Sequence, residues 1–276
     1  MKEVVSGRAE YGVQTPSIIV DRSEGNPVVV LAAVFQHSPV ALIVKSENGI
    51  ENPSHLAGRT IMLGEKNVEI RAMLISEGVL DKVNIIPFNG NYDALLKGNI
   101  DGASGYITDM SYVINQEEGV FSYIRPMTYG IDFYGDCLFT AEKEIKKDLE
   151  KVTAFRDASL KGWKYAMANP EEITELIISR YNPSLKKENL LYEYSQMKKL
   201  MFPDIVEIGH MNPGRWIHIA DTFQRLGLIK TDFKIEGFLY SHYLYSRWKY
   251  ERSILSAISL ILLAGLIFVV INYIRE

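Results

Sequence analysis

The sequence predicts an α/β fold followed by one long apolar helix, and two observations carry this prediction. Short apolar runs, such as 28–35 (VVVLAAVF) and 41–45 (ALIVK), alternate with longer segments of helical periodicity. Apolar runs of this length indicate strands that are buried on both faces, and their alternation with helices indicates βαβ units. Near the carboxyl end, residues 254–273 (ILSAISLILLAGLIFVVINY) contain no charged residue.

The composition excludes several classes of partner. The chain has 276 residues, of which 47% are hydrophobic, which is enough for one large or two small globular units. Its 30 basic and 34 acidic residues are too evenly balanced to predict the basic face that nucleic acid requires. The single cysteine, Cys137, excludes an internal disulfide and a multi-cysteine zinc site, and the five histidines lack metal-ligand spacing. We therefore expect no nucleic-acid partner, no metal and no cofactor.

Catalytic motifs are also missing from the sequence. It contains no phosphate-binding loop, no GxSxG elbow and no kinase signature. A cysteine–histidine pair is conceivable, but Cys137 lies in an apolar, strand-like context that favours a buried and inert thiol. We expect no catalytic residue and a protein that is not an enzyme.

The first half of the chain predicts alternating strands and helices. Residues 9–13 predict a short strand, and a helix is expected to begin near Thr15, with Pro16 in its first turn. The polar break 36–39 (QHSP) then joins the two apolar runs. Further strands are expected at 60–63, 83–87 and 102–107, and further helices at 68–77, 92–97 and 109–115. Polar residues gather at the strand ends, where open α/β sheets bind ligands.

The stretch 122–140 (SYIRPMTYGIDFYGDCLFT) is rich in aromatic residues and glycine. If it is extended, Asp132, Tyr134 and Asp136 alternate toward one face and present two carboxylates and a phenol. The alternative is an edge strand whose polar face is simply solvated. The chain after this stretch predicts mainly helices, at 149–168, 170–181, 187–201 and 212–226.

The apolar segment 254–273 is long enough to cross a bilayer. At ~1.5 Å of rise per residue, a helix of this length spans about 30 Å, the thickness of the hydrocarbon core. Aromatic and basic residues flank it, including Trp248 and Arg252 before it and Tyr273 and Arg275 at its end, and such residues suit the headgroup region. The alternative is a buried core helix. We expect a single membrane-spanning helix.

Several segments together resemble the type II periplasmic binding proteins of the thiamine-pyrimidine-precursor group, whose relatives bind sulfonates, nitrate and taurine. The matching text lies at 6–17 (SGRAEYGVQTPS), 25–63, 95–109 (LLKGNIDGASGYITD), 129–140 (YGIDFYGDCLFT) and 155–172. The resemblance implies two α/β lobes that are joined by crossing strands and hold a ligand in the cleft between them. It departs from the family at the start, because the family's first strand, first helix and following strand normally precede the position of Met1.

The resemblance also implies a division of the chain. Residues 1–52 and 132–245 would form the first lobe and residues 53–131 the second, with 254–273 as the membrane helix. The segments 41–45 and 132–140 would be the crossing strands.

An aminopyrimidine offers amine and ring-nitrogen groups that a carboxylate can match, and a face on which tyrosine can stack. The expected ligand-binding residues are Gln14, Thr15, Gln36, Glu65, Asn67, Tyr106, Asp132, Tyr134 and Asp136.

Three functions follow from this reading. The first is a membrane-tethered sensor whose lobes lie on the extracytoplasmic side of the membrane. Their closure on a small molecule is transmitted through the terminal helix to a cytoplasmic signalling module. The second is the binding component of an ABC importer, partnered by a permease. The third is an enzyme like the fungal proteins of this fold that make the thiamine pyrimidine, but these use a cysteine-rich motif, and this chain has one cysteine.

Overall fold

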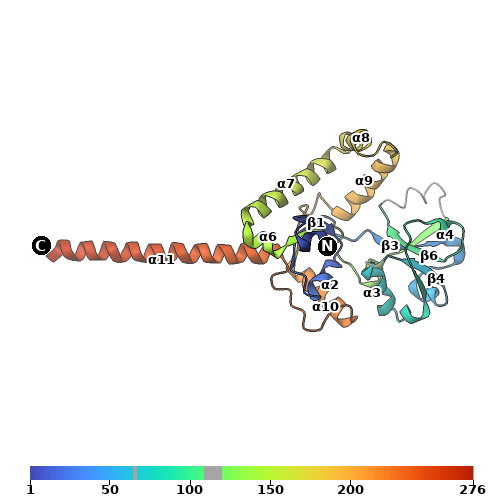
Figure 1. Cartoon of the computed structure of the whole chain (residues 1–276), viewed down its shortest axis with the longest axis horizontal. Helices are drawn as coiled ribbons and strands as arrows, with labels where there is room; N and C mark the ends of the chain where they lie inside the picture. Colours follow the sequence, from blue (N-terminus) through green and yellow to red (C-terminus); the bar gives the residue numbers. More distant parts are fainter. Residues whose placement is uncertain (65–66, 109–119, 276) are drawn as a thin grey trace.

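The fold is described from a computed structural model that places residues 1–64, 67–108 and 120–275. For positions 250, 251, 261 and 263–275 of the last helix, only the backbone is described. The predicted helix 109–115 and the predicted ligand residue Glu65 lie outside the described residues. The remaining chain forms two separate sheets with helices around them (Figure 1).

The first sheet has three antiparallel strands. In spatial order these are β1 (Tyr11–Gln14), β8 (Cys137–Ala141) and β2 (Val28–Ala33). Three short helices accompany it: α1 (Lys2–Ser6), α2 (Ile18–Ser23) and α6 (Glu142–Lys147). The run 28–35 is thus confirmed as a buried strand, since every residue of β2 is buried.

Helices cover both faces of β2, and this explains why the strand is apolar throughout. Val28 and Val30 belong to one core cluster with α2 and α10 (Pro213–Arg225). Val29 and Leu31 belong to a second cluster with α7 (Leu149–Ala168) and α9 (Lys187–Met201). A strand covered on both faces cannot alternate between apolar and polar residues.

The second sheet has five strands and is mixed. In spatial order these are β5 (Asn84–Pro87), β4 (Thr60–Leu63), β6 (Gly102–Tyr106), β3 (Val40–Lys45) and β7 (Phe121–Ile124). The strand β4 is parallel to β5 and β6, whereas β3 is antiparallel to β6 and β7. The helix α3 (Val68–Ser76) joins β4 to β5, and α4 (Asp93–Leu96) joins β5 to β6, as connections between parallel strands require a crossover. Single turns lie at η1 (Ser46–Asn48), η2 (Pro53–Leu56) and η3 (Leu80–Lys82).

The strand β3 corrects the predicted division of the chain. The prediction placed residues 1–52 in the first lobe, which corresponds to the half of the molecule around the three-stranded sheet, and made 41–45 a crossing strand. The second half of the molecule is the one around the five-stranded sheet. Instead, β3 pairs only with strands of the second sheet, so the chain has already crossed before Val40. The physical reason is that β3 is almost wholly buried. A strand inside a sheet is covered on both faces, whereas a connection between two lobes is exposed to solvent. The polar break 36–39 is therefore part of the crossing.

The stretch 122–140 does not form one extended strand. It contains β7, the turn η4 (Pro126–Tyr129), an irregular segment at 131–136, and then β8. The chain returns to the first sheet through 131–136, beside the outgoing segment 34–39.

The helical layer agrees closely with the prediction. The helices α7 and α9 have the predicted bounds. The helix α8 (Pro170–Arg180) ends one residue earlier than predicted, and α10 is one residue shorter than predicted at each end. Asp148 accepts the backbone N–H of Lys151 and so caps α7, and Pro170 begins α8.

The last helix, α11 (Tyr240–Arg275), leaves the first sheet on the side away from the second sheet (Figure 1). Its base is fixed to the body, since Tyr240 Oη lies 2.6 Å from Thr153 Oγ1 and Arg247 pairs with Glu150 at 2.9 Å. Among the described residues, no helix has the length and apolar character needed to cross a membrane. Most side chains of the segment 254–273 lie outside the described ones, so the membrane span stays a prediction.

Candidate functional site

The two crossing segments lie side by side between the sheets. The N–H of Val34 donates to the carbonyl of Asp136 at 2.8 Å, and the N–H of Gly135 donates to the carbonyl of Phe35 at 3.1 Å. A Cβ atom on Gly135 would lie 2.7 Å from the Cβ of Phe35, so this close approach requires glycine. The side chains of these two segments therefore lie between the two sheets, in the region that we call the junction of the two halves.

Asp136 and Tyr106 meet at this junction. Tyr106 lies on β6 in the second sheet, and its hydroxyl donates to Asp136 Oδ1 at 3.5 Å. Burial raises the pKa of Asp136 above its ordinary value, and the Tyr106 hydrogen bond opposes this. The structure thus brings together two of the residues expected from the sequence, one from each side.

Glu69 is a carboxyl group that the sequence reasoning missed. It lies in the first turn of α3, is 4% exposed, and makes a 2.6 Å hydrogen bond with Ser38 of the crossing segment. Burial raises its pKa to about 8, and the negative charges of Asp132 and Asp136 add to the rise. No sequence signal marked Glu69, because an acid in a first helical turn is ordinarily solvated.

Asp132 is held by two further residues that the prediction omitted. His37 Nδ1 lies 2.7 Å from Asp132 Oδ1, and Arg215 Nη2 lies 3.2 Å from the same oxygen. Arg215 also donates to the Asp132 carbonyl at 3.2 Å. His37 could have been found from its place in the polar break between two buried runs.

Tyr134 was predicted to share a face with Asp132 and Asp136, and the structure contradicts this. Tyr134 is 1% exposed and packs on Trp216, with ring centroids 5.4 Å apart. Its hydroxyl accepts the N–H of Asn212 at 2.9 Å, and the Arg215 guanidinium lies 4.3 Å above its ring. The alternation fails because residues 131–136 are not a regular strand.

Three of the other expected polar residues, Gln14, Thr15 and Gln36, are hydrogen-bonded to other protein groups. Gln14 Nε2 donates to Asp21 Oδ2 of α2 at 2.6 Å, and Thr15 Oγ1 lies 2.8 Å from Ser17 Oγ. The buried Gln36 donates to the carbonyl of His210 at 3.1 Å. Asn67 precedes α3 without a side-chain cap. These contacts fix the ends of elements around the crossing.

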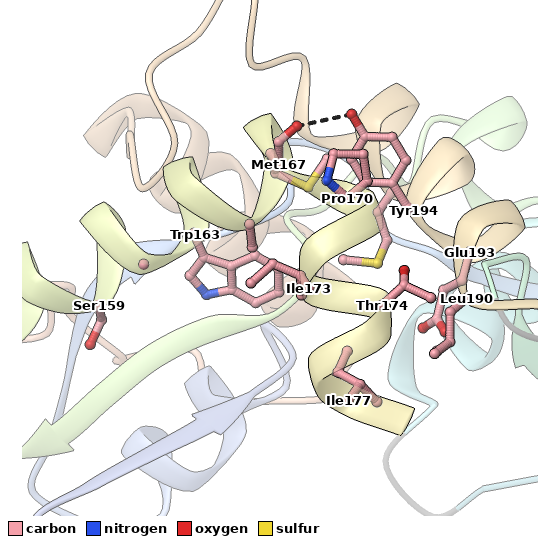
Figure 2. A pocket seen from close by; sticks show the side chains of 13 residues that line it. Ser159, Trp163, Met167, Pro170, Ile173, Thr174, Ile177, Leu190, Glu193 and Tyr194 are labelled. Atoms are coloured by element: carbon pink, nitrogen blue, oxygen red, sulfur yellow. Dashed lines mark hydrogen bonds between the residues drawn. The ribbon is translucent and has the colours of Figure 1, made fainter. Parts of the chain in front are cut away.

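Two cavities lie near these segments. The smaller, of about 200 Å³, lies between the halves and is lined by His37, Ile107, Arg125, Met127, Gln196, Lys199, Leu200 and Phe202. The larger, of about 530 Å³, lies wholly within the helical layer, between α7, α8 and α9. Figure 2 shows the Trp163 ring and the Met167 and Ile173 side chains around it, with Tyr194 donating to the Met167 carbonyl at 2.9 Å. None of the expected ligand residues lines either of these two cavities.

The residues that could support metal or thiol chemistry are the histidines, the acidic residues and Cys137. Over residues 1–64, 67–108 and 120–275, no group of three His, Cys, Asp or Glu side chains is arranged to hold a metal ion. Cys137 is buried, its thiol donates to the Gly135 carbonyl at 3.3 Å, and burial raises the pKa of the thiol well above its ordinary value. A thiol in that state is a poor nucleophile.

A solved structure shares this fold. The periplasmic sulfonate-binding protein of a sulfonate ABC transporter from Methylobacillus flagellatus superposes with a TM-score of 0.63 at 19% identity. The match covers 91% of this chain and 78% of that one. The architecture is therefore that of a periplasmic binding protein.

Two curated relatives match in sequence. The formylaminopyrimidine-binding protein of Halalkalibacterium halodurans is 24% identical over 173 residues, 59% of this chain and 52% of the relative. The riboflavin-binding protein RibY of Chloroflexus aurantiacus is 25% identical over 178 residues, 62% of this chain and 50% of the relative. The chain spans about half the length of these relatives. A family model described as NMT1/THI5 like matches residues 1–173, and the chain therefore belongs to the NMT1/THI5-like family.

Proposed function

We propose that the chain is an extracytoplasmic solute-binding domain that holds a small, flat, polar heterocycle between its two halves. The observation that carries this proposal is the meeting of Asp136 and Tyr106 across the junction, with Glu69 at its edge. Polar groups that converge from two lobes onto a crossing segment are typical of ligand sites at domain interfaces.

The chemistry of these groups suits an aminopyrimidine. The Asp136 carboxylate accepts hydrogen bonds from an exocyclic amine, and the Tyr106 ring offers a face for stacking. Below a pH of about 8 the Glu69 carboxyl keeps its proton, since its pKa is raised by burial, and it then donates to a ring nitrogen. The named ligands of the two curated relatives, a formylaminopyrimidine and riboflavin, are both planar heterocycles with ring nitrogens, which supports this class of ligand.

Calorimetric titration with a 4-aminopyrimidine tests the proposal. We expect saturable binding to the full chain, and a loss of about 10- to 100-fold in affinity for Asp136→Asn, because a charge-assisted hydrogen bond contributes about 1.5–3 kcal/mol. Asp81→Asn is the matched control, since Asp81 is exposed and lies in η3, just before the amino end of β5. Equal affinities in all three proteins, or no binding to the wild-type chain, would refute the proposal.

We also propose that residues 254–273 tether this domain to a membrane. The segment is uncharged, and those of its apolar side chains that are described lie in solvent, with Leu255, Leu260 and Leu262 64%, 67% and 68% exposed. Co-flotation with lipid vesicles should be lost in the double variant Leu260→Asp and Leu262→Asp. It should persist in Leu244→Asp, which changes an exposed leucine of the same helix outside the segment. The tether is contradicted if the wild type does not float with the vesicles, or if the wild type and both variants all float.

Two uses of such a domain remain, a sensor and an importer component. The contacts of Tyr240 and Arg247 at the base of α11 favour the sensor, because motion of the first sheet would be passed to the helix. The likeness to the binding protein of an ABC transporter favours the importer. Sequencing the gene beyond Glu276 separates them: a signalling module supports the sensor, and a stop codon beside permease genes supports the importer.

A further inference from the structure

The smaller cavity at the junction has a basic lining. Of its eight lining residues, three are His37, Arg125 and Lys199, and none is an aspartate or glutamate. These three come from different parts of the chain: the crossing segment, the end of β7 and the last turn of α9. Arg125 therefore belongs to one half of the molecule and Lys199 to the other.

The topology of the second sheet places Arg125 at the junction. Both β6 and β7 run antiparallel to β3, so their carboxyl ends lie at the same edge of the sheet. Ile107 follows β6 and Arg125 follows β7, and both line the cavity at that edge.

The charges of the two longest basic side chains are not neutralised by described neighbours. The Arg125 guanidinium makes no ion pair or side-chain hydrogen bond with another residue that the structure describes. Lys199 Nζ donates to the neutral Gln196 Oε1 at 3.3 Å. His37 is paired with Asp132, which lies outside the lining. Two cations in one small cavity attract an anion.

The end of α9 lies against this cavity. Phe202, which follows α9, has φ 52°, and no other non-glycine residue within the described ranges has a positive φ. Its ring meets the His37 ring edge-on, with centroids 5.3 Å apart. This left-handed residue is the C-cap of α9. The Leu200 carbonyl, which would repel an anion, already accepts the N–H groups of Gln36 and His37 at 2.9 and 3.1 Å.

We propose that this cavity binds a small oxyanion, a phosphate or sulfonate, that links Arg125 of the second half to Lys199 of the first. The guanidinium donates in a bidentate way to two anion oxygens, and the ammonium of Lys199 donates to a third. The bound anion holds the two halves together at an edge of the junction. Asp136 and Tyr106, which are proposed to bind the heterocycle, are not part of this site. The anion site can therefore be tested independently of the proposed function.

Calorimetric titration of the full chain with inorganic phosphate tests this site. We expect one saturable site, weakened about tenfold or more in Arg125→Gln and in Lys199→Gln, because each removes a charge-assisted hydrogen bond. Arg180→Gln and Lys161→Gln are matched controls on exposed faces of α8 and α7 and should bind like the wild type. Arg125→Lys, which keeps the charge and loses the fork, should fall between. Circular dichroism of each variant checks that it is folded.

A second titration distinguishes a free anion from an anionic group on the heterocycle. Phosphate binding that depends on Arg125 identifies a free anion. Tighter binding of a phosphate ester than of the parent aminopyrimidine, with the gain lost in Arg125→Gln, identifies a group carried by the ligand. The inference is overturned if phosphate affinity does not depend on Arg125 and Lys199, and the ester binds no more tightly than the parent aminopyrimidine. Phosphate binding without aminopyrimidine binding would refute the proposed function and would still support the anion site.

Discussion

Glu69 makes the stability of the fold depend on pH in a direction that can be calculated. Its folded-state pKa is about 8, and its ordinary value is 4.5. The folded state therefore holds this proton more tightly than the unfolded state does. A raised folded pKa gives stability that is fully present below pH 4.5 and is lost as the pH rises toward 8.

Substituting Glu69→Gln should remove this loss. Glutamine has the same shape, stays neutral and can accept the Ser38 hydrogen bond. The pH difference between 4.5 and 7 is 2.5 units, and one pKa unit is about 1.4 kcal/mol, so the variant should be more stable at pH 7 by about 3 kcal/mol. At pH 4.5 the two proteins should be nearly equal in stability.

Urea unfolding at pH 4.5, 6, 7 and 8 measures this difference. Glu77→Gln is the control, because Glu77 is exposed at the end of the same helix, and surface changes usually stay within about 0.5 kcal/mol. If Glu69→Gln and the wild type lose stability in parallel between pH 4.5 and 8, then Glu69 is not a buried neutral acid in the folded protein. Glu69 would then not be a hydrogen-bond donor to the ligand at neutral pH.

Three further changes test the packing around the site, each by urea unfolding. Gly162→Ala should stabilise the fold by up to about 1 kcal/mol, because Gly162 is inside α7 and a Cβ there meets nothing within 4 Å; a loss would contradict the open cavity beside it. Gly135→Ala should destabilise by about 1–3 kcal/mol, since its Cβ would clash with Phe35, and an unchanged midpoint would mean that the crossing segments are farther apart. Tyr134→Phe should cost about 1–3 kcal/mol, because the N–H of Asn212 loses its acceptor; a solvent-facing Tyr134 predicts no change.

Much of the fold was predictable because its signals are local. The bounds of α7 follow from Asp148, which caps its amino end, and from Asn169 and Pro170, which end it. The strands β2 and β4 were found from their apolar runs, since burial on both faces leaves little room for polar residues. These features depend on neighbours in the sequence, so one sequence suffices to find them.

The candidate site was less predictable because it depends on contacts between distant segments. The alternation rule placed Tyr134 beside Asp136, but the irregular backbone at 131–136 turns Tyr134 into the core against Trp216. Glu69 becomes a site candidate only because Ser38, 31 residues earlier, lies against it. The strand β3 was assigned to the wrong half for a similar reason, since an apolar run predicts burial without predicting which sheet provides it.

The most direct test of the central claim is a crystal structure of the chain with an aminopyrimidine bound. We predict that the ring lies between the two sheets, with its amine about 3 Å from the Asp136 carboxylate and its face toward Tyr106. A ring seated in the larger cavity between α7, α8 and α9, away from both residues, would contradict it.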